Sequence, residues 1–477
     1  MAERNASTKE TKGDSPMLMP EDLMHFIQRD TYSLLIKGFA GTGKTTLALT
    51  ILKTLGSKNS FFYISTRISP KQLFQYYPWL NDFVEQFKPK SESVASDHEV
   101  MPSFEDARLD EPESLFERIT NQLMDIKSPV IIIDSWDSIA SFMDREARLN
   151  NERVLQTWRE RAGAKLIFIS EHPADTTLDF LVDGIVELKQ SYYNNVRVRQ
   201  IFLLKLRGIC INRPSYIYTL ENGMFRSFVP YRPTNFEPRK RIKAHALELA
   251  AGGHHIRSGF PVLDMALGSG FPRKSLVLLE LDSHMNMTIA VAFLERIVSN
   301  FVSTGNPVLF QAFDWIDLST IMRFFEPCMS AGKKSLFKIL WTGKTNNKIS
   351  NNIISLGKSR GSDPLLAAVL KMKQKHPDKL LLNIMWTDVM QRLYGAKRVR
   401  NGMKNILSNM RANADLSIAV IRYSQEDVLE LLSEISDVRL RFVMINDTLF
   451  LRSLVPSSTL YSLVFDEGSE VSLDPVV

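Results

Sequence analysis

The chain has 477 residues, of which 44% are hydrophobic and 23% are charged, and its formal net charge is +6. This composition is typical of a soluble globular protein, and the length predicts two domains. The cysteines are Cys210 and Cys328, too few for a disulfide framework or a cysteine-based zinc site, so we expect a cytoplasmic protein. No apolar run approaches the roughly 20 residues that span a bilayer, so we expect no membrane segment.

Strand and helix patterns alternate through the first half of the chain. Residues 1–20 are mostly polar and are expected to form a disordered tail, and residues 21–228 are expected to form the first domain. Short apolar runs predict buried strands and are separated by helical patterns: Ser33–Lys37, Phe61–Ser65, Pro129–Asp134 and Lys165–Ser170 are the strands, and Thr46–Leu55 is a helix. This alternation predicts a parallel sheet flanked by helices. Residues Val196–Arg207 alternate apolar and polar side chains, which predicts antiparallel strands at one edge.

The second half repeats this pattern in degraded form. We expect a basic linker over residues 229–255 and a second domain over residues 256–477. The predicted elements of that domain follow the order of the first, with a helix at Thr288–Val298 and strands at Ser275–Leu281, Val308–Ala312, Leu380–Trp386 and Leu416–Arg422. The sequence therefore predicts two α/β domains in tandem. An unrelated α/β domain with similar strand spacing is the alternative.

A glycine-rich loop joins the first strand to the first helix. It reads Gly38-Phe39-Ala40-Gly41-Thr42-Gly43-Lys44-Thr45, is followed by Thr46, and matches the pattern G-x-x-x-x-G-K-[ST]. Its glycines permit dihedral angles closed to other residues, so backbone amides can converge on phosphate oxygens at a helix N-terminus. We expect Lys44 to neutralise the β- and γ-phosphates and the Thr45 hydroxyl to bind Mg²⁺. Mg-ATP is therefore the expected ligand of these loop residues, Thr46 included.

Asp134 is the second metal candidate. It closes the apolar strand Val130-Ile-Ile-Ile133, where a carboxylate can accept a hydrogen bond from magnesium-bound water. The alternative is an N-cap for the following helix, a role that Ser135 and Asp137 could also fill.

Together these residues resemble the RecA-like ATPases, and among them the KaiC/RadA group. The resemblance runs from Tyr32 to Gly223 and includes Leu181-Val-Asp-Gly-Ile-Val-Glu-Leu188 and Lys205-Leu-Arg-Gly208. In that group the last element is a Lys-x-Arg finger that contacts the γ-phosphate of a neighbouring subunit. The resemblance thus implies that Lys205 and Arg207 serve an adjacent copy of the chain, in a homo-oligomer such as a hexameric ring. A basic strand facing solvent is the alternative.

The first domain departs from the group at one position. KaiC-like ATPases carry an acidic pair after the second strand, including a glutamate that polarises the attacking water, whereas this chain has Thr66-Arg67-Ile68. Neither threonine nor cationic arginine is a general base. Glu171 could substitute as a catalytic residue beside Lys44, so we expect slow or absent hydrolysis. The run Tyr63-Ile-Ser-Thr-Arg67, with Pro78-Trp79-Leu80, also resembles the gas-vesicle regulator D (GvpD-like) branch of archaeal P-loop proteins.

The second domain also resembles this family but has lost the phosphate loop. If Thr288 is aligned with the motif threonine, Asn286 and Met287 replace Gly-Lys, and Leu281 replaces the first glycine. Asp388 comes slightly late for the magnesium aspartate. We therefore expect this domain not to bind ATP in the usual way.

The leading hypothesis from the sequence is a regulatory ATP-binding protein whose degenerate domain serves assembly or a regulatory protein partner. A DNA-handling recombinase or helicase-like motor is the first alternative, although binding to nucleic acid is not favoured because the net charge is modest. A scaffold that no longer binds nucleotide is the second alternative, and the intact loop argues against it.

Overall fold

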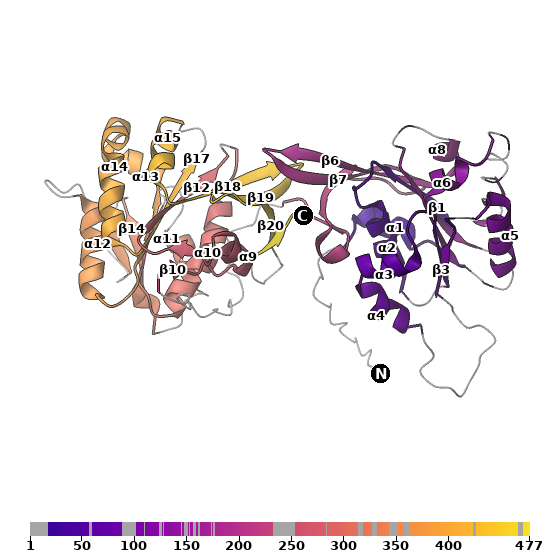
Figure 1. The fold of residues 1–477 in the computed structure, drawn as a ribbon. Helices are drawn as coiled ribbons and strands as arrows, with labels where there is room; N and C mark the ends of the chain where they lie inside the picture. Colours follow the sequence, from indigo (N-terminus) through magenta and orange to yellow (C-terminus); the bar gives the residue numbers. More distant parts are fainter. Residues whose placement is uncertain are drawn as a thin grey trace, which may run out of the picture. The chain divides into compact units, whose positions relative to one another are not determined.

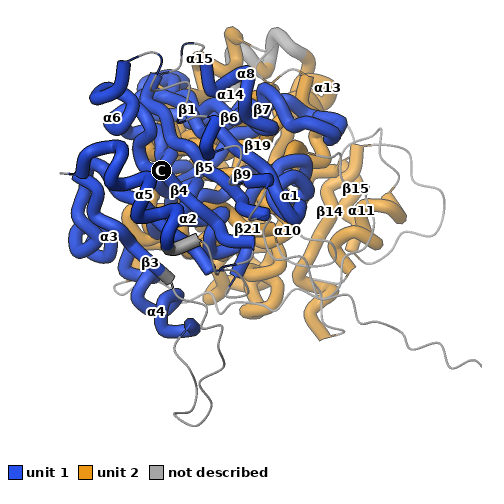
Figure 2. The backbone as a smooth tube through the Cα atoms, turned by 90° about the vertical axis from the view of Figure 1, so that its right-hand side faces the viewer, with its two compact units in different colours: residues 1–229, 476–477 blue, residues 230–475 orange. Residues whose placement is uncertain are grey.

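The computed structural model describes residues 18–56, 60–87, 102–108, 110–123, 126, 128–144, 146, 151, 153–155, 159–160, 163–172, 174, 177–231, 253–282, 284–312, 318–326, 332–342, 352–356, 363–422, 426–465 and 471–477. The chain forms two compact units (Figure 2), unit 1 comprising residues 1–229 with 476–477 and unit 2 comprising residues 230–475. Most of the predicted tail and linker, at 1–17 and 232–252, lies outside the described residues.

The described part of unit 1 is built on a nine-stranded sheet in the order β3-β2-β4-β5-β1-β6-β7-β8-β9 (Figure 1). The strands β3, β2, β4, β5, β1 and β6 run parallel to one another. The pairs β6·β7, β7·β8 and β8·β9 are antiparallel. The strands are β1 (Tyr32–Gly38), β2 (Phe61–Ser65), β3 (Pro102–Asp106), β4 (Val130–Asp134), β5 (Lys165–Ser170), β6 (Gly184–Tyr193), β7 (Val196–Leu206), β8 (Ser215–Thr219) and β9 (Arg226–Ser227).

Helices cover both faces of this sheet because successive strand residues point to opposite sides. Leu34 and Ile36 of β1 pack with the helices on one face, whereas Leu35 packs on the other. The first face carries α1 (Glu21–Ile27), α2 (Lys44–Leu55), α3 (Pro70–Tyr76) and α4 (Trp79–Glu85), and the second carries α5 (Pro112–Leu123), α6 (Trp136–Ala140) and α8 (Thr177–Leu181). The sheet is therefore buried on both sides, which matches its apolar strands.

Unit 2 has the same architecture, with a ten-stranded sheet in the order β15-β14-β13-β16-β17-β12-β18-β19-β20-β21 in its described part. The strands from β15 to β18 are parallel and the remaining strands are antiparallel. They are β12 (Ser275–Leu281), β13 (Val308–Gln311), β14 (Phe337–Trp341), β15 (Ile353–Ser355), β16 (Leu382–Trp386), β17 (Leu416–Arg422), β18 (Val438–Ile445), β19 (Thr448–Val455), β20 (Leu460–Phe465) and β21 (Val471–Pro475). A small sheet pairs β10 (His255–Ile256) with β11 (Phe271–Pro272).

Helices again cover both faces of the unit 2 sheet. One face carries α9 (Pro261–Ala266), α10 (Thr288–Ser303) and α11 (Leu318–Phe325). The other carries α12 (Pro364–Lys375), α13 (Thr387–Tyr394), α14 (Ala396–Asn413) and α15 (Glu426–Ile435).

The two sheets repeat one strand order. In unit 1 it is β2-β4-β5-β1-β6-β7, and in unit 2 it is β13-β16-β17-β12-β18-β19. The prediction of two RecA-like α/β domains with antiparallel strands at one edge is thereby confirmed. Within the described residues, no helix combines the length and apolar character needed to cross a bilayer.

The ends of unit 1 differ from the sequence-based boundaries. Leu18 to Pro20 were assigned to the tail, but Met19 is fully buried and the Leu18 carbonyl accepts a hydrogen bond from the Ser227 amide at 3.2 Å. Residues 476–477 were assigned to the second domain but belong to unit 1, where the Val477 amide donates to the Thr219 hydroxyl at 3.2 Å. In each case an apolar residue near a chain end packs on the unit.

Candidate nucleotide-binding site

The glycine-rich loop lies between β1 and α2, at the carboxyl edge of the parallel strands. Gly38, Gly41 and Gly43 have φ values of 153°, 79° and 91°. A Cβ on Gly38 would lie 2.3 Å from the Leu188 carbonyl oxygen, and one on Gly43 would lie 2.6 Å from Leu220 Cδ1. Both the dihedral angles and the surrounding space therefore require glycine at these two positions.

Lys44 lies folded across this loop. Its Nζ donates to the carbonyl oxygens of Gly38 at 2.8 Å and of Phe39 at 2.9 Å. Burial lowers the pKa of the ammonium, while the charges of Glu171 and Asp134 oppose that shift. The lysine is thus held at the loop by groups that a phosphate oxygen can replace.

The predicted metal residues are in direct contact. The Thr45 hydroxyl donates to Asp134 Oδ2 at 2.6 Å, and the Tyr63 hydroxyl of β2 donates to the same oxygen at 2.5 Å. Burial raises the pKa of Asp134, and the hydrogen bonds from Thr45 and Tyr63 and the charge of Lys44 counteract that effect. A hydroxyl next to a carboxylate supplies the hard oxygen groups that Mg²⁺ uses together with water and phosphate, so these residues fit the ion.

The other loop residues have different surroundings. Phe39, Ala40 and Gly41 are exposed, with 65% of the Phe39 surface accessible. The Thr42 carbonyl accepts a hydrogen bond from the Tyr218 hydroxyl at 2.5 Å.

The side chain of Thr46 is hydrogen-bonded to a tyrosine. Its hydroxyl lies 2.9 Å from the hydroxyl of Tyr77. Tyr77 and Tyr218 thus hold the helix and the loop by hydrogen bonds, and the Thr46 hydroxyl already has a protein partner.

Arg67 and Glu171 form an ion pair, with 2.6 Å between Nη1 and Oε1. Arg67 follows β2 by two residues and Glu171 follows β5 directly. Glu171, which was predicted as a substitute base, is therefore paired with Arg67, the residue found where related ATPases have an acidic pair.

Lys205 lies level with the middle of β1, and Arg207 lies two residues further from the loop. In register, Lys205 pairs with Ile185, which pairs with Leu35, three residues before β1 ends at Gly38. Lys205 Nζ donates to the Asp179 carbonyl at 2.9 Å, and Arg207 Nη1 lies 3.3 Å from Asp183 Oδ1. These two residues are not brought to the loop of their own chain.

Comparisons with known proteins agree with this geometry. Residues 23–207 match the family model described as the GvpD gas vesicle protein, P-loop domain. Unit 1 contains a GvpD-type P-loop domain. Such a domain is a nucleotide-binding domain, and the chain is distantly similar to GvpD and KaiC proteins.

The individual relatives are distant. Protein GvpD2 of Halobacterium salinarum is 25% identical over 301 residues, covering 60% of this chain and 59% of the relative. GvpD1 of the same organism is 26% identical over 323 residues, covering 64% and 58%. The circadian clock oscillator protein KaiC of Thermosynechococcus vestitus is 23% identical over 309 residues, covering 60% and 53%. The chain thus spans between half and two thirds of the length of these relatives.

The described residues between β12 and α10 of unit 2 differ from the loop of the GvpD-type domain. Between β12 and α10, the Met285 amide donates to the Asp282 carbonyl at 3.0 Å and the Thr288 amide to Asn286 Oδ1 at 3.0 Å. Met285 and Met287 are both buried in the core. These amides are therefore committed to their own loop.

Charged groups at the unit 2 edge are also paired internally. Glu280, which precedes the end of β12 by one residue, is fully buried and lies 2.8 Å from Arg439 Nη2 and 2.6 Å from Arg441 Nη2. Asp388 lies 3.6 Å from Arg422 Nε. The charges of Glu280 and Asp388 are thus compensated within unit 2.

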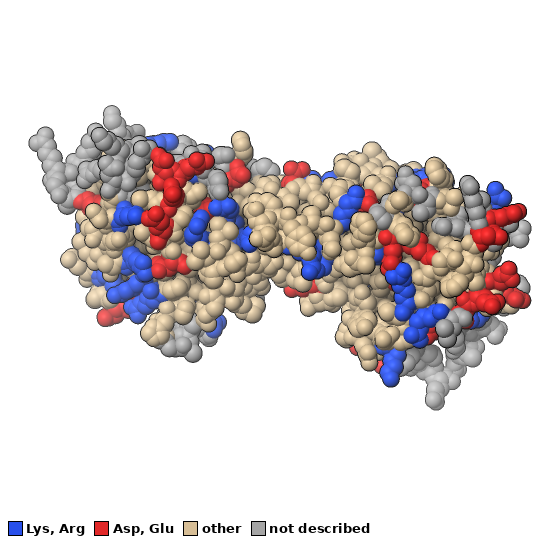
Figure 3. All heavy atoms as spheres, turned by 45° about the horizontal axis from the view of Figure 1, so that its top comes forward, with Lys and Arg blue, Asp and Glu red and all other residues tan. Residues whose placement is uncertain are grey.

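Residues Lys189 to Lys243 are rich in lysine and arginine, and these charges are partly neutralised where the segment is described in the GvpD-type domain. Lys189 Nζ lies 3.0 Å from Glu187, and Arg199 is buried, with a hydrogen bond to the Val477 carbonyl. On the face drawn in Figure 3, acidic and basic side chains are interspersed in both units. The described residues on that face form no extended patch of one sign, the kind of surface that favours binding to a phosphate backbone.

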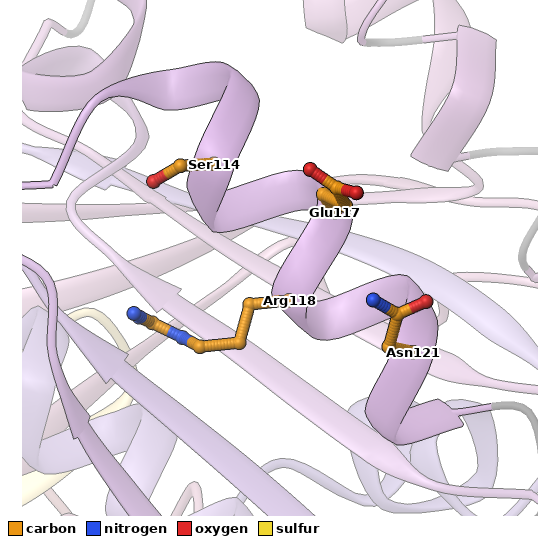
Figure 4. A pocket seen from close by; sticks show the side chains of 4 residues that line it. All are labelled: Ser114, Glu117, Arg118 and Asn121. Atoms are coloured by element: carbon orange, nitrogen blue, oxygen red, sulfur yellow. The ribbon is translucent and has the colours of Figure 1, made fainter.

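A shallow hollow lies along α5, away from the loop. It is lined by Ser114, Glu117, Arg118 and Asn121 (Figure 4). Arg118 pairs with Asp110 at 2.6 Å, so its charge is already compensated.

Sequence reasoning missed the hydroxyl partners of the GvpD-type site. Tyr63, Tyr77 and Tyr218 lie in separate segments, and none of them belongs to a motif for binding phosphate or metal. The alternation of strand residues could only have predicted that Tyr63 shares a sheet face with Phe61, which packs in the core.

Proposed function

We propose that this protein is an ATP-binding regulatory protein of the RecA/KaiC-like family, in which Mg-ATP binding to unit 1 acts as a conformational or assembly switch. The observation that carries the proposal is the contact between Thr45 and Asp134 beside a lysine folded over a glycine loop. Loop amides and Lys44 would hold the phosphates, and Thr45 with Asp134 would hold the magnesium ion and its water. The bound ion supplies charge neutralisation of the β- and γ-phosphates.

A switch is favoured over a motor by the surroundings of the expected nucleophile. Hydrolysis needs a basic group that orients water at the γ-phosphate. The only acidic candidate from the sequence, Glu171, is paired with Arg67 at 2.6 Å. We therefore propose that turnover is slow or absent and that nucleotide binding itself is the signal.

Assembly is the proposed response to that signal. Lys205 and Arg207 lie away from the loop edge of their own sheet, with Arg207 Nη1 3.3 Å from Asp183. Their predicted γ-phosphate role therefore requires a second copy of the chain, and the likeness to KaiC supports a ring such as a hexamer. Unit 2, with its internally paired charges, would serve as an assembly surface or bind a regulatory protein partner.

The test is sedimentation velocity of the full chain without nucleotide, with Mg-ADP and with Mg-ATP. We expect a larger assembly with Mg-ATP alone, and no such change in Lys44→Ala or Arg207→Ala. Arg108→Ala is a matched control, because it removes an exposed arginine paired with Asp106 at 2.7 Å. An assembly state that ignores nucleotide would refute the assembly switch. ATP turnover stimulated by DNA would favour the motor instead.

A further inference from the structure

The ion pair of Arg67 and Glu171 spans the carboxyl edge of the sheet beside the phosphate loop. The order β2-β4-β5-β1 places the end of β4 between the segments that carry the two residues, and β5 lies next to the strand that leads into the loop. Arg67 therefore reaches across the end of the strand that carries Asp134. Its side chain runs from the end of β2 to the end of β5, the strand next to β1.

The backbone on both sides of this pair is fixed by hydrogen bonds. The Thr66 amide donates to the Asp134 carbonyl at 2.8 Å, and the Ser135 amide donates to the Thr66 hydroxyl at 2.8 Å. On the other side, the Glu171 amide donates to Asp137 Oδ2 at 2.5 Å. A change in the pairing of Arg67 thus needs only side-chain rotation.

The side chains themselves remain accessible. Those of Arg67 and Glu171 are 49% and 27% exposed, and Arg67 Nε has one further contact, with the Ser138 hydroxyl at 3.3 Å. An accessible ion pair contributes little on its own and can exchange partners. A guanidinium binds phosphate oxygens with two parallel hydrogen bonds, and a γ-phosphate carries more charge than one carboxylate.

We propose that Arg67 is a γ-phosphate ligand in its own chain and that Glu171 holds it in reserve when no γ-phosphate is bound. With ADP or without nucleotide, Arg67 stays on Glu171; with ATP, Arg67 turns to the γ-phosphate and Glu171 loses its partner. The pair therefore distinguishes ATP from ADP at the site where related ATPases activate water. This inference rests on the proposed binding of Mg-ATP by unit 1.

The electrostatics of the loop lysine supports this reach. Glu171 raises and Arg67 lowers the pKa of Lys44, the residue that contacts the loop carbonyls. Both charges therefore act at the position where the terminal phosphates are expected.

The test is equilibrium binding of ATP and of ADP, each with Mg²⁺, to the full-length chain by calorimetry. For Arg67→Ala we expect ATP affinity to fall at least about tenfold, the loss of one charge-assisted contact, and ADP affinity to change less than about twofold. Glu171→Gln removes the competing charge and should raise ATP affinity without changing ADP affinity. Arg67→Lys should lie between wild type and Arg67→Ala, and Arg108→Ala should match wild type.

Equal losses for ATP and ADP in Arg67→Ala would assign the arginine a structural role and overturn the inference. Unchanged affinity for both nucleotides in Arg67→Ala would also overturn it, while leaving the proposed nucleotide switch intact. A wild-type chain that binds neither nucleotide would overturn both proposals together.

Discussion

The hydrogen bond from Tyr63 to Asp134 can be removed almost in isolation by Tyr63→Phe. The ring of Tyr63 is fully buried, and its hydroxyl donates to a buried carboxylate at 2.5 Å. Phenylalanine keeps the ring and its packing, so the variant loses one hydrogen bond to a charged acceptor. Such a bond contributes about 2 kcal/mol to stability. We therefore expect the free energy of unfolding of unit 1 to fall by about that amount.

Tyr32→Phe is the matched control in the same unit. Tyr32 is also buried, at 1% exposure, but its hydroxyl has no hydrogen-bond partner among the described residues. Removing an unpaired buried hydroxyl should leave stability unchanged or raise it by up to about 1 kcal/mol. The two tyrosines thus separate the effect of the hydrogen bond from that of the deleted oxygen atom.

Hydrogen exchange of the full chain, resolved by peptide across a denaturant series, measures this effect in each unit. Amides of β1 and β4 should exchange faster in Tyr63→Phe, and those of β12 and β17 in unit 2 should not change. Equal destabilisation by Tyr63→Phe and Tyr32→Phe, or a loss below about 0.5 kcal/mol in Tyr63→Phe, would refute the role assigned to this bond.

Three further predictions concern the loop and unit 2. Lys44→Ala should reduce ATP affinity at least about a hundredfold in calorimetry and leave no second binding event, because we expect unit 2 not to bind ATP in the usual way; residual binding of one equivalent would contradict this. Gly38→Ala should abolish nucleotide binding and lower the melting temperature, because its Cβ would lie 2.3 Å from the Leu188 carbonyl oxygen; unchanged binding would refute the argument. Burial alone would raise the pKa of Asp415, but hydrogen bonds from Lys373 and neighbouring donors lower the pKa overall. The ionised Asp415 therefore contributes its whole stabilising free energy above pH 3.8, and this contribution is lost as the pH falls through the lowered pKa. Asp415→Asn should thus lower the free energy of unfolding by about 2 kcal/mol at pH 7. Chemical denaturation at a series of pH values should show that the difference between wild type and variant shrinks at acid pH. A difference that does not change with pH would contradict the predicted direction.

The parts of the fold that sequence could predict are those encoded by neighbouring residues. The phosphate loop needs glycine at positions of positive φ next to a lysine and a threonine, so its pattern is contiguous and specific. Buried parallel strands such as β4 are equally visible, because Val130–Asp134 has apolar side chains on both faces. The repeated succession of strands and helices along the chain followed from these two signals.

Elements with mixed composition were harder to predict. The strand β3 (Pro102–Asp106) contains a proline, a serine and two acids within an acidic stretch, and only pairing with β2 identifies it as a strand. The strand β15 (Ile353–Ser355) lies in a polar segment that resembles an exposed insertion, and it gains its structure by pairing with β14. Tertiary pairing, rather than local preference, decides both.

The side-chain partners in the site depend on contacts between distant segments. Arg67 was recognised from the sequence only as a departure from the family pattern, and Glu171 as a candidate base. That the two bind each other at 2.6 Å depends on the strand order, which places β2 and β5 on either side of β4. The roles of Lys205 and Arg207 depend on a second copy of the chain and remain a prediction.

The most direct test of the ATP switch is single-turnover hydrolysis measured together with ATP binding, in wild type and in Lys44→Ala. We expect the wild type to bind one equivalent of ATP and Lys44→Ala to bind none. We expect hydrolysis in the wild type to be far below about 1 s⁻¹, the lower end of typical enzyme turnover. Hydrolysis at about 1 s⁻¹ or faster would contradict it, because another group would then have to activate water at the γ-phosphate.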